Sequence, residues 1–149
     1  MRAVIQRCNW CQVVSEGKET GRIGKGLLAF IGVRKGDTEK DAQYIVDKIL
    51  HLRIFEDEND KMNHSVQDIN GGVALISQFT LYGDCRHGRR PSFTEAENPE
   101  QANELYESVV SLCRASGVHI ITGKFQTHMN ITSDNDGPVT IIIDSSKLF

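Results

Sequence analysis

Hydrophobic and polar residues along the 149-residue chain follow two periods, one of two residues and one close to that of a helix. Seven segments are predicted as strands, and two of them, residues 1–14 in part and residues 73–81, alternate between apolar and polar positions. The seven segments are residues 1–14, 27–33, 53–55, 73–81, 118–122, 125–132 and 139–144. Polar stretches predict turns over 15–21 and 133–138. A chain dominated by strands is therefore expected.

Two segments instead carry apolar residues at helical spacing. Thr38 with Asp41 three residues later forms a capping-box signature, and the apolar positions that follow predict a helix over 38–50. Asn98 is a favourable N-cap, and the apolar face that follows predicts a second helix over 99–116. The order of elements predicts a compact, mixed α/β protein with few helices.

Length and composition are those of one globular domain over residues 1–149. A chain of this size buries roughly 68–70% of its unfolded surface, so it needs no metal or disulfide to fold. Hydrophobic residues at 39% and charged residues at 25% exclude collagen, coiled coil and global disorder. The longest apolar run, Leu27–Ile31, is far below the roughly 18 residues of a membrane helix. With no signal-peptide pattern at the N-terminus, we expect a cytoplasmic protein without a membrane partner.

Net charge and cysteine content limit the partners further. A formal charge of −3 argues against coating nucleic acid by bulk electrostatics, so any contact with nucleic acid must be local, and no DNA partner is expected. Cys8 and Cys11 form a C-x-x-C, but a strand-like segment without a second C-x-x-C or a histidine pair does not favour zinc. Nor does the motif open a helix, as redox sites require. We expect reduced structural thiols, and no metal or organic cofactor in catalysis.

Two segments carry candidate chemistry, and each also has an ordinary explanation. Residues 77–81, SQFTL, place polar side chains inside an otherwise apolar strand. Neighbouring backbone could satisfy those polar groups, or the strand end could present its N–H groups to a pocket. Residues 135–140, NDGPVT, contain Asp-Gly-Pro, which as a turn needs no function. Neither segment is decisive alone.

Together and in this order, the two segments resemble the signature motifs of the D-aminoacyl-tRNA deacylases, also called D-tyrosyl-tRNA deacylases. The resemblance covers nearly the whole chain, and further matching segments occur in the same order. They are Gln6-Arg7, residues 24–28, residues 53–55, residues 61–63, residues 90–93, residues 122–125 and Met129. Two departures are Ser133-Asp134, where apolar residues are common, and the unusual tetrapeptide at 8–11.

The resemblance implies a layered β/β/α single domain with mainly antiparallel sheets and two principal helices, assembled as a homodimer. It implies hydrolysis of the ester that joins a D-amino acid, or mischarged glycine, to tRNA. The implied catalytic residues are Ser77, Gln78, Phe79 and Thr80. The implied substrate-binding and chiral-filter residues are Gly137, Pro138, Met129 and Asn135. In such dimers the Gly-Pro dipeptide, with its X-Pro bond cis, enters the partner's pocket beside residues 77–80.

The chemistry of chiral selection is consistent with that arrangement. D and L esters differ only in which position on Cα carries hydrogen, so attraction to a shared group cannot discriminate and rejection is needed. A backbone carbonyl close to Cα admits hydrogen and excludes an L side chain. Gly137 adds no Cβ to obstruct this approach, and Pro138 has a fixed φ. Glycine, without a side chain, passes the same filter.

Hydrolysis of an activated ester needs mainly a placed water and an oxyanion site. The N–H groups near Phe79 and Thr80 are the candidate oxyanion donors. Thr80 is a weak candidate nucleophile because no His or Lys adjoins it in sequence. Ser77 does not lie in a G-x-S-x-G elbow. By resemblance, the terminal 2′-OH of the tRNA assists attack, and Thr80 shapes the pocket.

A short basic run follows the first motif. Its members are Arg86, His87, Arg89 and Arg90. Such a run is usually a solvated loop, here balanced by Glu95 and Glu97, but at the edge of an active site Arg86, Arg89 and Arg90 could contact tRNA phosphates. His128 could line the pocket, although an isolated histidine is more often a satisfied surface or core residue.

Two other functions stay open at this point. One is a related deacylase for mischarged L-alanyl-tRNA, although Val139 after Gly-Pro resembles the D-specific branch instead. The other is a non-catalytic module that binds tRNA acceptor ends.

Overall fold

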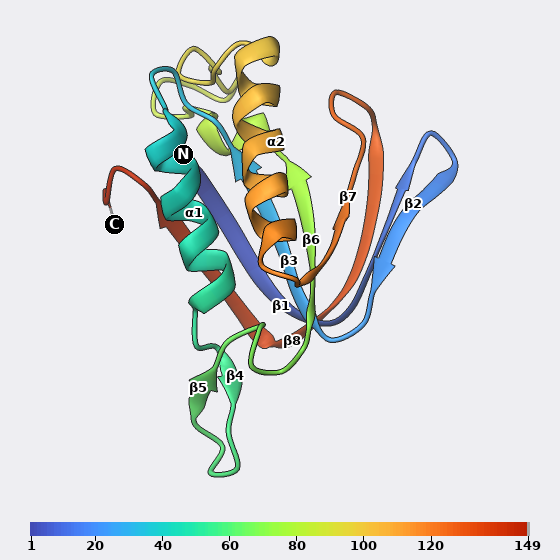
Figure 1. Cartoon of the computed structure of the whole chain (residues 1–149). Helices are drawn as coiled ribbons and strands as arrows, with labels where there is room; N and C mark the ends of the chain where they lie inside the picture. The colour runs from blue at the N-terminus through green and yellow to red at the C-terminus, as the bar shows by residue number, and fades with distance from the viewer. Residues whose placement is uncertain (149) are drawn as a thin grey trace.

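The computed structural model describes residues 1–148, in which the elements alternate between strands and two long helices (Figure 1). The strands are β1 (Arg2–Ser15), β2 (Lys18–Ile23), β3 (Gly26–Gly32), β4 (Phe55–Glu56), β5 (Met62–His64), β6 (Gly72–Ser77), β7 (His119–Thr122) and β8 (Met129–Asp144). The helices are α1 (Glu39–His51), the short 3₁₀ helix η1 (Phe79–Tyr82) and α2 (Pro99–Ala115).

The main sheet is mixed and is organised around β1. Its order is β2-β1-β3-β6-β7, and β8 pairs with β1 in addition. β1 is antiparallel to β2, β3 and β8, whereas β3, β6 and β7 run parallel. β8 follows β1 over almost its whole length, from Arg2 opposite Asp144 to Ser15 opposite Met129. The predicted mixed, mainly antiparallel sheet is confirmed.

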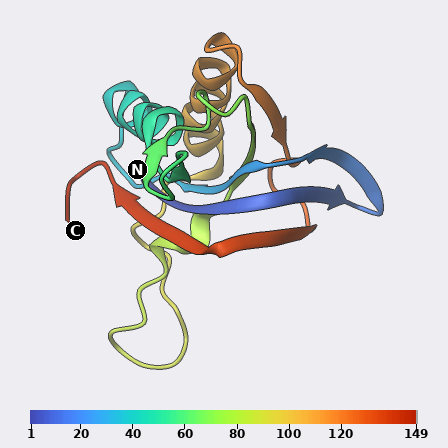
Figure 2. The same ribbon diagram turned by 90° about the horizontal axis from the view of Figure 1, so that it is seen from below.

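The molecule has three layers, and an apolar cluster lies between each neighbouring pair of layers. In the larger cluster, Ile45 and Ile49 of α1 and Val109 of α2 pack with the sheet residues Leu27 and Leu75. The smaller cluster contains Cys8, Cys11 and Val13 of β1 together with Ile76 and Ile121 from the parallel strands. Figure 2 shows the two helices on one side and the curved pair β1 and β8 on the other. These layers confirm the expected β/β/α arrangement.

Both predicted helix starts are confirmed by their caps. The Asp41 carboxylate accepts a hydrogen bond from the Thr38 backbone N–H at 2.8 Å. The Asn98 side chain accepts one from Gln101 N–H at 3.1 Å. Each cap satisfies a donor that the first helical turn leaves open, so local sequence is sufficient to start the helix here. No helix within residues 1–148 is long and apolar enough to cross a membrane.

The predicted strand over 73–81 is wrong beyond Ser77. The Gln78 N–H bonds the Ile31 carbonyl at 2.7 Å, and the neighbouring strand β3 ends one residue after Ile31. Without a partner strand to pair with, the chain turns into η1. The polar motif therefore straddles a strand end rather than lying within a strand.

The predicted turn over 133–138 is also wrong, because β8 is one continuous strand through this segment. Its pairing with β1 shifts register between Gln6 and Cys8 and again between Cys8 and Trp10, and these irregularities accommodate the Asp-Gly-Pro segment. Pro138 has no N–H to contribute to a ladder, which an edge strand tolerates.

Three smaller differences concern strand limits. β8 begins at Met129, not residue 125, because residues 124–127 form a turn in which Gln126 has a φ of 59°. The polar stretch 15–21 is mostly strand β2. The predicted strand over 53–55 overlaps the structure only at Phe55, where β4 begins and pairs with β5 in a small hairpin.

Candidate active site

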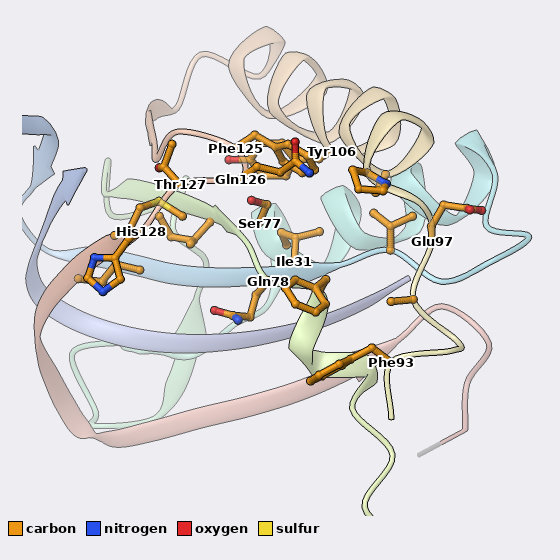
Figure 3. Close-up of a pocket in the computed structure, with 18 residues that line it drawn as sticks. Ile31, Ser77, Gln78, Phe93, Glu97, Tyr106, Phe125, Gln126, Thr127 and His128 are labelled. Carbon is orange, nitrogen blue, oxygen red and sulfur yellow. The ribbon is translucent and has the colours of Figure 1, made fainter. Parts of the chain in front are cut away.

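A cavity of about 710 Å³ opens where β6 ends, and we call it the strand-end cavity (Figure 3). Its walls come from four parts of the fold: the β3 and β6 ends, the loop before α2, the first turns of α2, and the segment that leads into β8. The parallel pairing of β3 with β6 sets Ile31 opposite Ser77, so both strand ends reach the same cavity. This is the usual place for a site in an open sheet with parallel strands.

Three of the four predicted catalytic residues line the strand-end cavity. They are Ser77, Gln78 and Phe79. Phe79 and Thr80 open η1, so their N–H groups have no acceptor inside the helix, and no carbonyl of residues 1–148 outside it accepts from them. The structure thus presents two free amide donors at the strand end.

Thr80 lies just outside the cavity lining and is exposed. Its hydroxyl accepts a hydrogen bond from the Gln78 side-chain amide. No histidine, lysine or carboxylate within residues 1–148 forms a hydrogen bond with this hydroxyl. The geometry therefore supplies no general base to Thr80.

An aromatic wall closes the cavity on the side of α2. The rings of Tyr106 and Phe125 lie 6.1 Å apart between centroids, and the Tyr106 hydroxyl donates to the Leu75 carbonyl at 2.8 Å. Burial raises the pKa of the Tyr106 hydroxyl, which keeps it neutral. Sequence reasoning missed Tyr106, because a helix face that lines a cavity has the same apolar pattern as one that faces a core. It missed Phe125, because the segment 125–132 was predicted as a strand and Phe125 instead lies in a turn before β8.

Met129 and His128 also line the cavity, where β8 begins. Gly123 packs directly against Met129, since a Cβ at this glycine would come within 2.1 Å of the Met129 sulfur. His128 is exposed at the rim. Met129 thus lines the same cavity as Ser77, Gln78 and Phe79.

The Gly137-Pro138 dipeptide lies elsewhere in the same chain. Its peptide bond is cis, as the resemblance implies, and both residues are exposed on β8. Neither residue lines the strand-end cavity, and β1 and β3 stand between β8 and β6 in the sheet. Asn135 supports the segment, because its side-chain oxygen accepts from the Val139 N–H at 3.2 Å.

Arg7 binds the segment that carries Gly137 and Pro138 through its contacts with Asp136. Its guanidinium donates to the Asp136 carbonyl at 3.2 Å and to the Ile54 carbonyl at 2.8 Å, and it pairs with the Asp136 carboxylate at 3.1 Å. Arg7 is only 5% exposed. Sequence reasoning missed this role, although the inward alternation of β1 marks Arg7 as a charge on a largely buried strand.

The three predicted tRNA-binding arginines differ in their surroundings. They lie on a projecting segment, residues 84–92, that we call the basic loop and that stands away from the body in Figure 2. Arg86 pairs with the Asp84 carboxylate through two nitrogens, at 2.9 and 2.7 Å. This pair lowers the pKa of Asp84. Arg89 and Arg90 form no ion pair with any residue of the 1–148 span and are exposed.

The cysteines form no disulfide. Cys8 and Cys11 are buried, and burial raises the pKa of their thiols to about 12 and about 11. Within residues 1–148, no group of three or more His, Cys, Asp or Glu side chains is arranged to hold a metal ion.

Comparison with known proteins agrees with this geometry. The family model described as D-Tyr-tRNA(Tyr) deacylase matches residues 4–144. Two relatives named D-aminoacyl-tRNA deacylase, from Thermotoga petrophila and Clostridioides difficile, are 58% and 54% identical over all of both chains. A solved structure of a c-Myc DNA unwinding element binding protein is 37% identical with a TM-score of 0.91, over 97% of this chain and 98% of that one.

A further solved structure, of a probable eukaryotic D-amino acid tRNA deacylase, has a TM-score of 0.81 over 95% of this chain and 97% of that one. At 17% identity it supports the fold alone. The match of the family model and the identity to full-length relatives define the class of enzyme, a hydrolase of ester bonds. The chain belongs to the D-Tyr-tRNA(Tyr) deacylase family.

Proposed function

We propose that the protein hydrolyses the ester of D-aminoacyl-tRNA, and of glycine mischarged on tRNA, as a cytoplasmic homodimer of 149-residue single-domain subunits. Water adds to the ester carbonyl and the bond to the ribose oxygen breaks, which releases the free amino acid and the tRNA. The observation that carries the proposal is the pair of free amide donors, at Phe79 and Thr80, beside a cavity with one aromatic wall.

The two donors fit an oxyanion site. Backbone N–H groups that already point at the developing negative charge cost no reorganisation during the reaction. A strand that ends at Ser77 and turns at once into η1 produces two adjacent donors without a side chain. The terminal 2′-OH of the tRNA assists the attack, so Thr80 needs no base and forms no acyl intermediate.

Chiral selection in this proposal comes from the second subunit. Gly137 and Pro138 are exposed and lie outside their own subunit's cavity, so only another copy of the chain can bring them to a substrate. Arg7 and Asn135 hold the segment of the dipeptide in place through hydrogen bonds. A dipeptide held in this way can exclude an L side chain by steric contact instead of moving aside for it. A D ester presents only hydrogen to this backbone, and an L ester presents its side chain.

The edge of the sheet favours such a dimer. β8 has 16 residues and, among residues 1–148, pairs with β1 alone, and a long open edge strand is normally covered in soluble proteins. Ile142 on this strand is 54% exposed and lies opposite Val4. A second copy placed against β8 would cover apolar surface and the open strand edge together.

The basic loop provides the contact with tRNA in this proposal. Arg89 and Arg90 have no carboxylate partner within the described chain and can pair with phosphates, whereas Asp84 already neutralises Arg86. We therefore assign the phosphate contact mainly to Arg89 and Arg90. A contact limited to one loop is compatible with the overall charge of −3.

The direct test is turnover. Purified protein is incubated with D-tyrosyl-, L-tyrosyl- and glycyl-tRNA, and loss of each ester is followed over time. We expect the D and glycyl esters to be lost and the L ester to persist. Loss of an L-alanyl ester in a parallel reaction would indicate a relaxed chiral filter. If no ester is lost, the protein is a non-catalytic module that binds tRNA acceptor ends.

A further inference from the structure

Two phenylalanines at the mouth of the strand-end cavity are unusually exposed for large apolar side chains. Phe79 is 57% exposed and Phe93 is 36% exposed, and both line the cavity. Their ring centroids lie 5.0 Å apart with an angle of 69° between the planes. Figure 3 shows Phe93 on the side of the cavity opposite His128. The pair forms an apolar ledge that faces solvent beside a site for a charged polymer.

Backbone contacts hold this ledge in a set place. Asp84 and Ser92 exchange two hydrogen bonds, Asp84 N–H to the Ser92 carbonyl at 2.7 Å and Ser92 N–H to the Asp84 carbonyl at 2.9 Å. A Cβ at Gly83 would meet the Phe93 ring at 3.1 Å. Phe93 is therefore packed at the base of the basic loop, where it also lines the cavity.

We propose that Phe79 and Phe93 are a stacking platform for the unpaired bases that precede the terminal nucleotide of the tRNA. The inference rests on the proposed function, because an ester bound in the cavity obliges the rest of the single-stranded 3′ end to leave across its mouth. Aromatic rings bind unpaired bases face to face without regard to sequence. Arg89 and Arg90 precede Phe93 on the same loop and are exposed, which suits them to contact neighbouring phosphates of such a strand.

Ordinary packing is the competing explanation, since an edge-to-face ring pair at this distance is common in apolar interiors. The exposure of both rings favours a ligand, yet the face of a second subunit could also cover them. A binding measurement that distinguishes unpaired bases from phosphates, combined with a measurement of oligomeric state, separates a base platform from packing and from a subunit contact.

The test compares two RNA hairpins with the same stem, one with an unpaired four-nucleotide 3′ tail and one with a blunt end. Neither hairpin carries an esterified amino acid, and their dissociation constants are measured for wild type, Phe93→Leu and Phe93→Tyr. We expect Phe93→Leu to weaken binding of the tailed hairpin about 5- to 150-fold, the range expected for one lost base stack. Binding of the blunt hairpin should stay unchanged, and Phe93→Tyr should bind both hairpins as wild type does.

Equal losses for tailed and blunt hairpins, or none for either, would overturn the platform. So would a Phe93→Leu protein that sediments as a smaller species than wild type, which would make Phe93 a subunit contact. Failure of the proposed function gives a different result. A wild-type protein that binds the tailed hairpin through Phe93 but hydrolyses no ester would support the stacking platform and contradict the proposed enzyme activity.

Discussion

Arg7 and Asp136 are joined twice, through the Arg7 Nε–H to the Asp136 carbonyl at 3.2 Å and through an ion pair to its carboxylate at 3.1 Å. The two residues are 129 positions apart in sequence and meet because β1 and β8 pair antiparallel. A third bond, to the Ile54 carbonyl at 2.8 Å, ties the same guanidinium to the connection before β4. One buried cation thus anchors the segment that we propose as the chiral filter.

We predict that Arg7→Lys reduces both stability and chiral selection. A lysine carries a point charge rather than a planar fork, so it cannot serve the Ile54 and Asp136 carbonyls together. A buried carbonyl left without a donor costs about 1–3 kcal/mol of unfolding free energy, measurable by urea denaturation. The ratio of kcat/KM for D- and L-tyrosyl-tRNA should fall in the same variant.

Arg34→Lys is the matched control for this change. Arg34 pairs with Glu95 on the surface, and both side chains are substantially exposed. Such pairs contribute about 0–1 kcal/mol, so stability should change little. An Arg7→Lys enzyme with the wild-type ratio of D to L turnover would separate Arg7 from chiral selection.

Gly137→Ala should also damage the filter. Gly137 has a φ of +126°, and an added Cβ would come within 2.8 Å of a Val139 methyl group and 3.3 Å of the Arg7 guanidinium. The dipeptide must then shift, and a change of 1.4 kcal/mol between competing transition states already alters selection about tenfold. Single-turnover rates on D- and L-tyrosyl-tRNA measure it.

Gly17→Ala provides the control for backbone strain alone. Gly17 also has a positive φ, of 78°, but a Cβ there meets nothing within 4 Å. Selection should persist in that variant. If both glycine variants show the same ratio of D- to L-tyrosyl-tRNA hydrolysis, the position of the dipeptide does not determine chiral selection.

Thr80→Ala should remain an active enzyme. The Thr80 hydroxyl has a hydrogen bond from Gln78 and no base, so its loss should cost on the order of 1 kcal/mol, or about fivefold in rate. Loss of a true nucleophile would instead cost about 10⁶ in kcat. Rapid-quench kinetics measure the rate, and mass spectrometry of wild type during turnover would reveal an acyl-Thr80 adduct if the hydroxyl attacks.

The arginines of the basic loop should differ in their contribution to tRNA affinity. Arg89→Gln and Arg90→Gln should each reduce the slope of log affinity against log salt concentration by about 0.7, because each removes one contact with a single-stranded phosphate. Arg86→Gln should change the slope less, since Asp84 already holds that guanidinium. Equal effects at all three positions would show that the Asp84 pair opens on binding.

Cysteine reactivity should reveal the burial pattern. The pKa of Cys8 is raised to about 12 and that of Cys11 to about 11, because burial disfavours the thiolate that reacts with electrophiles. Cys113 is likewise buried, and burial raises the pKa of its thiol to about 12, whereas Cys85 is exposed. Iodoacetamide at pH 8 should label Cys85 alone in the folded protein and all four thiols in urea, as read by peptide mass mapping.

The helices were predictable because their signals are local. The caps at Thr38 and Asn98 act within four residues, and the apolar faces of both helices repeat at one period. The end of β6 was not predictable in the same way. It depends on where β3 stops, which is a property of another part of the chain.

The candidate site divides along the same line. The motifs at 77–80 and 135–140 were recognisable as residues, but their separation within one subunit was not, since it follows from the position of β8 beyond β1. Tyr106, Phe125 and Phe93 joined the site only through packing.

By itself, the sequence established the class of fold, the helix limits and the two motifs, because periodicity, caps and residue identity act over short distances along the chain. Tertiary structure alone decided that β8 is continuous, that Arg7 anchors Asp136, and that a cavity lies at the end of β6. These features depend on contacts between residues far apart in sequence, and such contacts leave no periodic signal in the segments that make them.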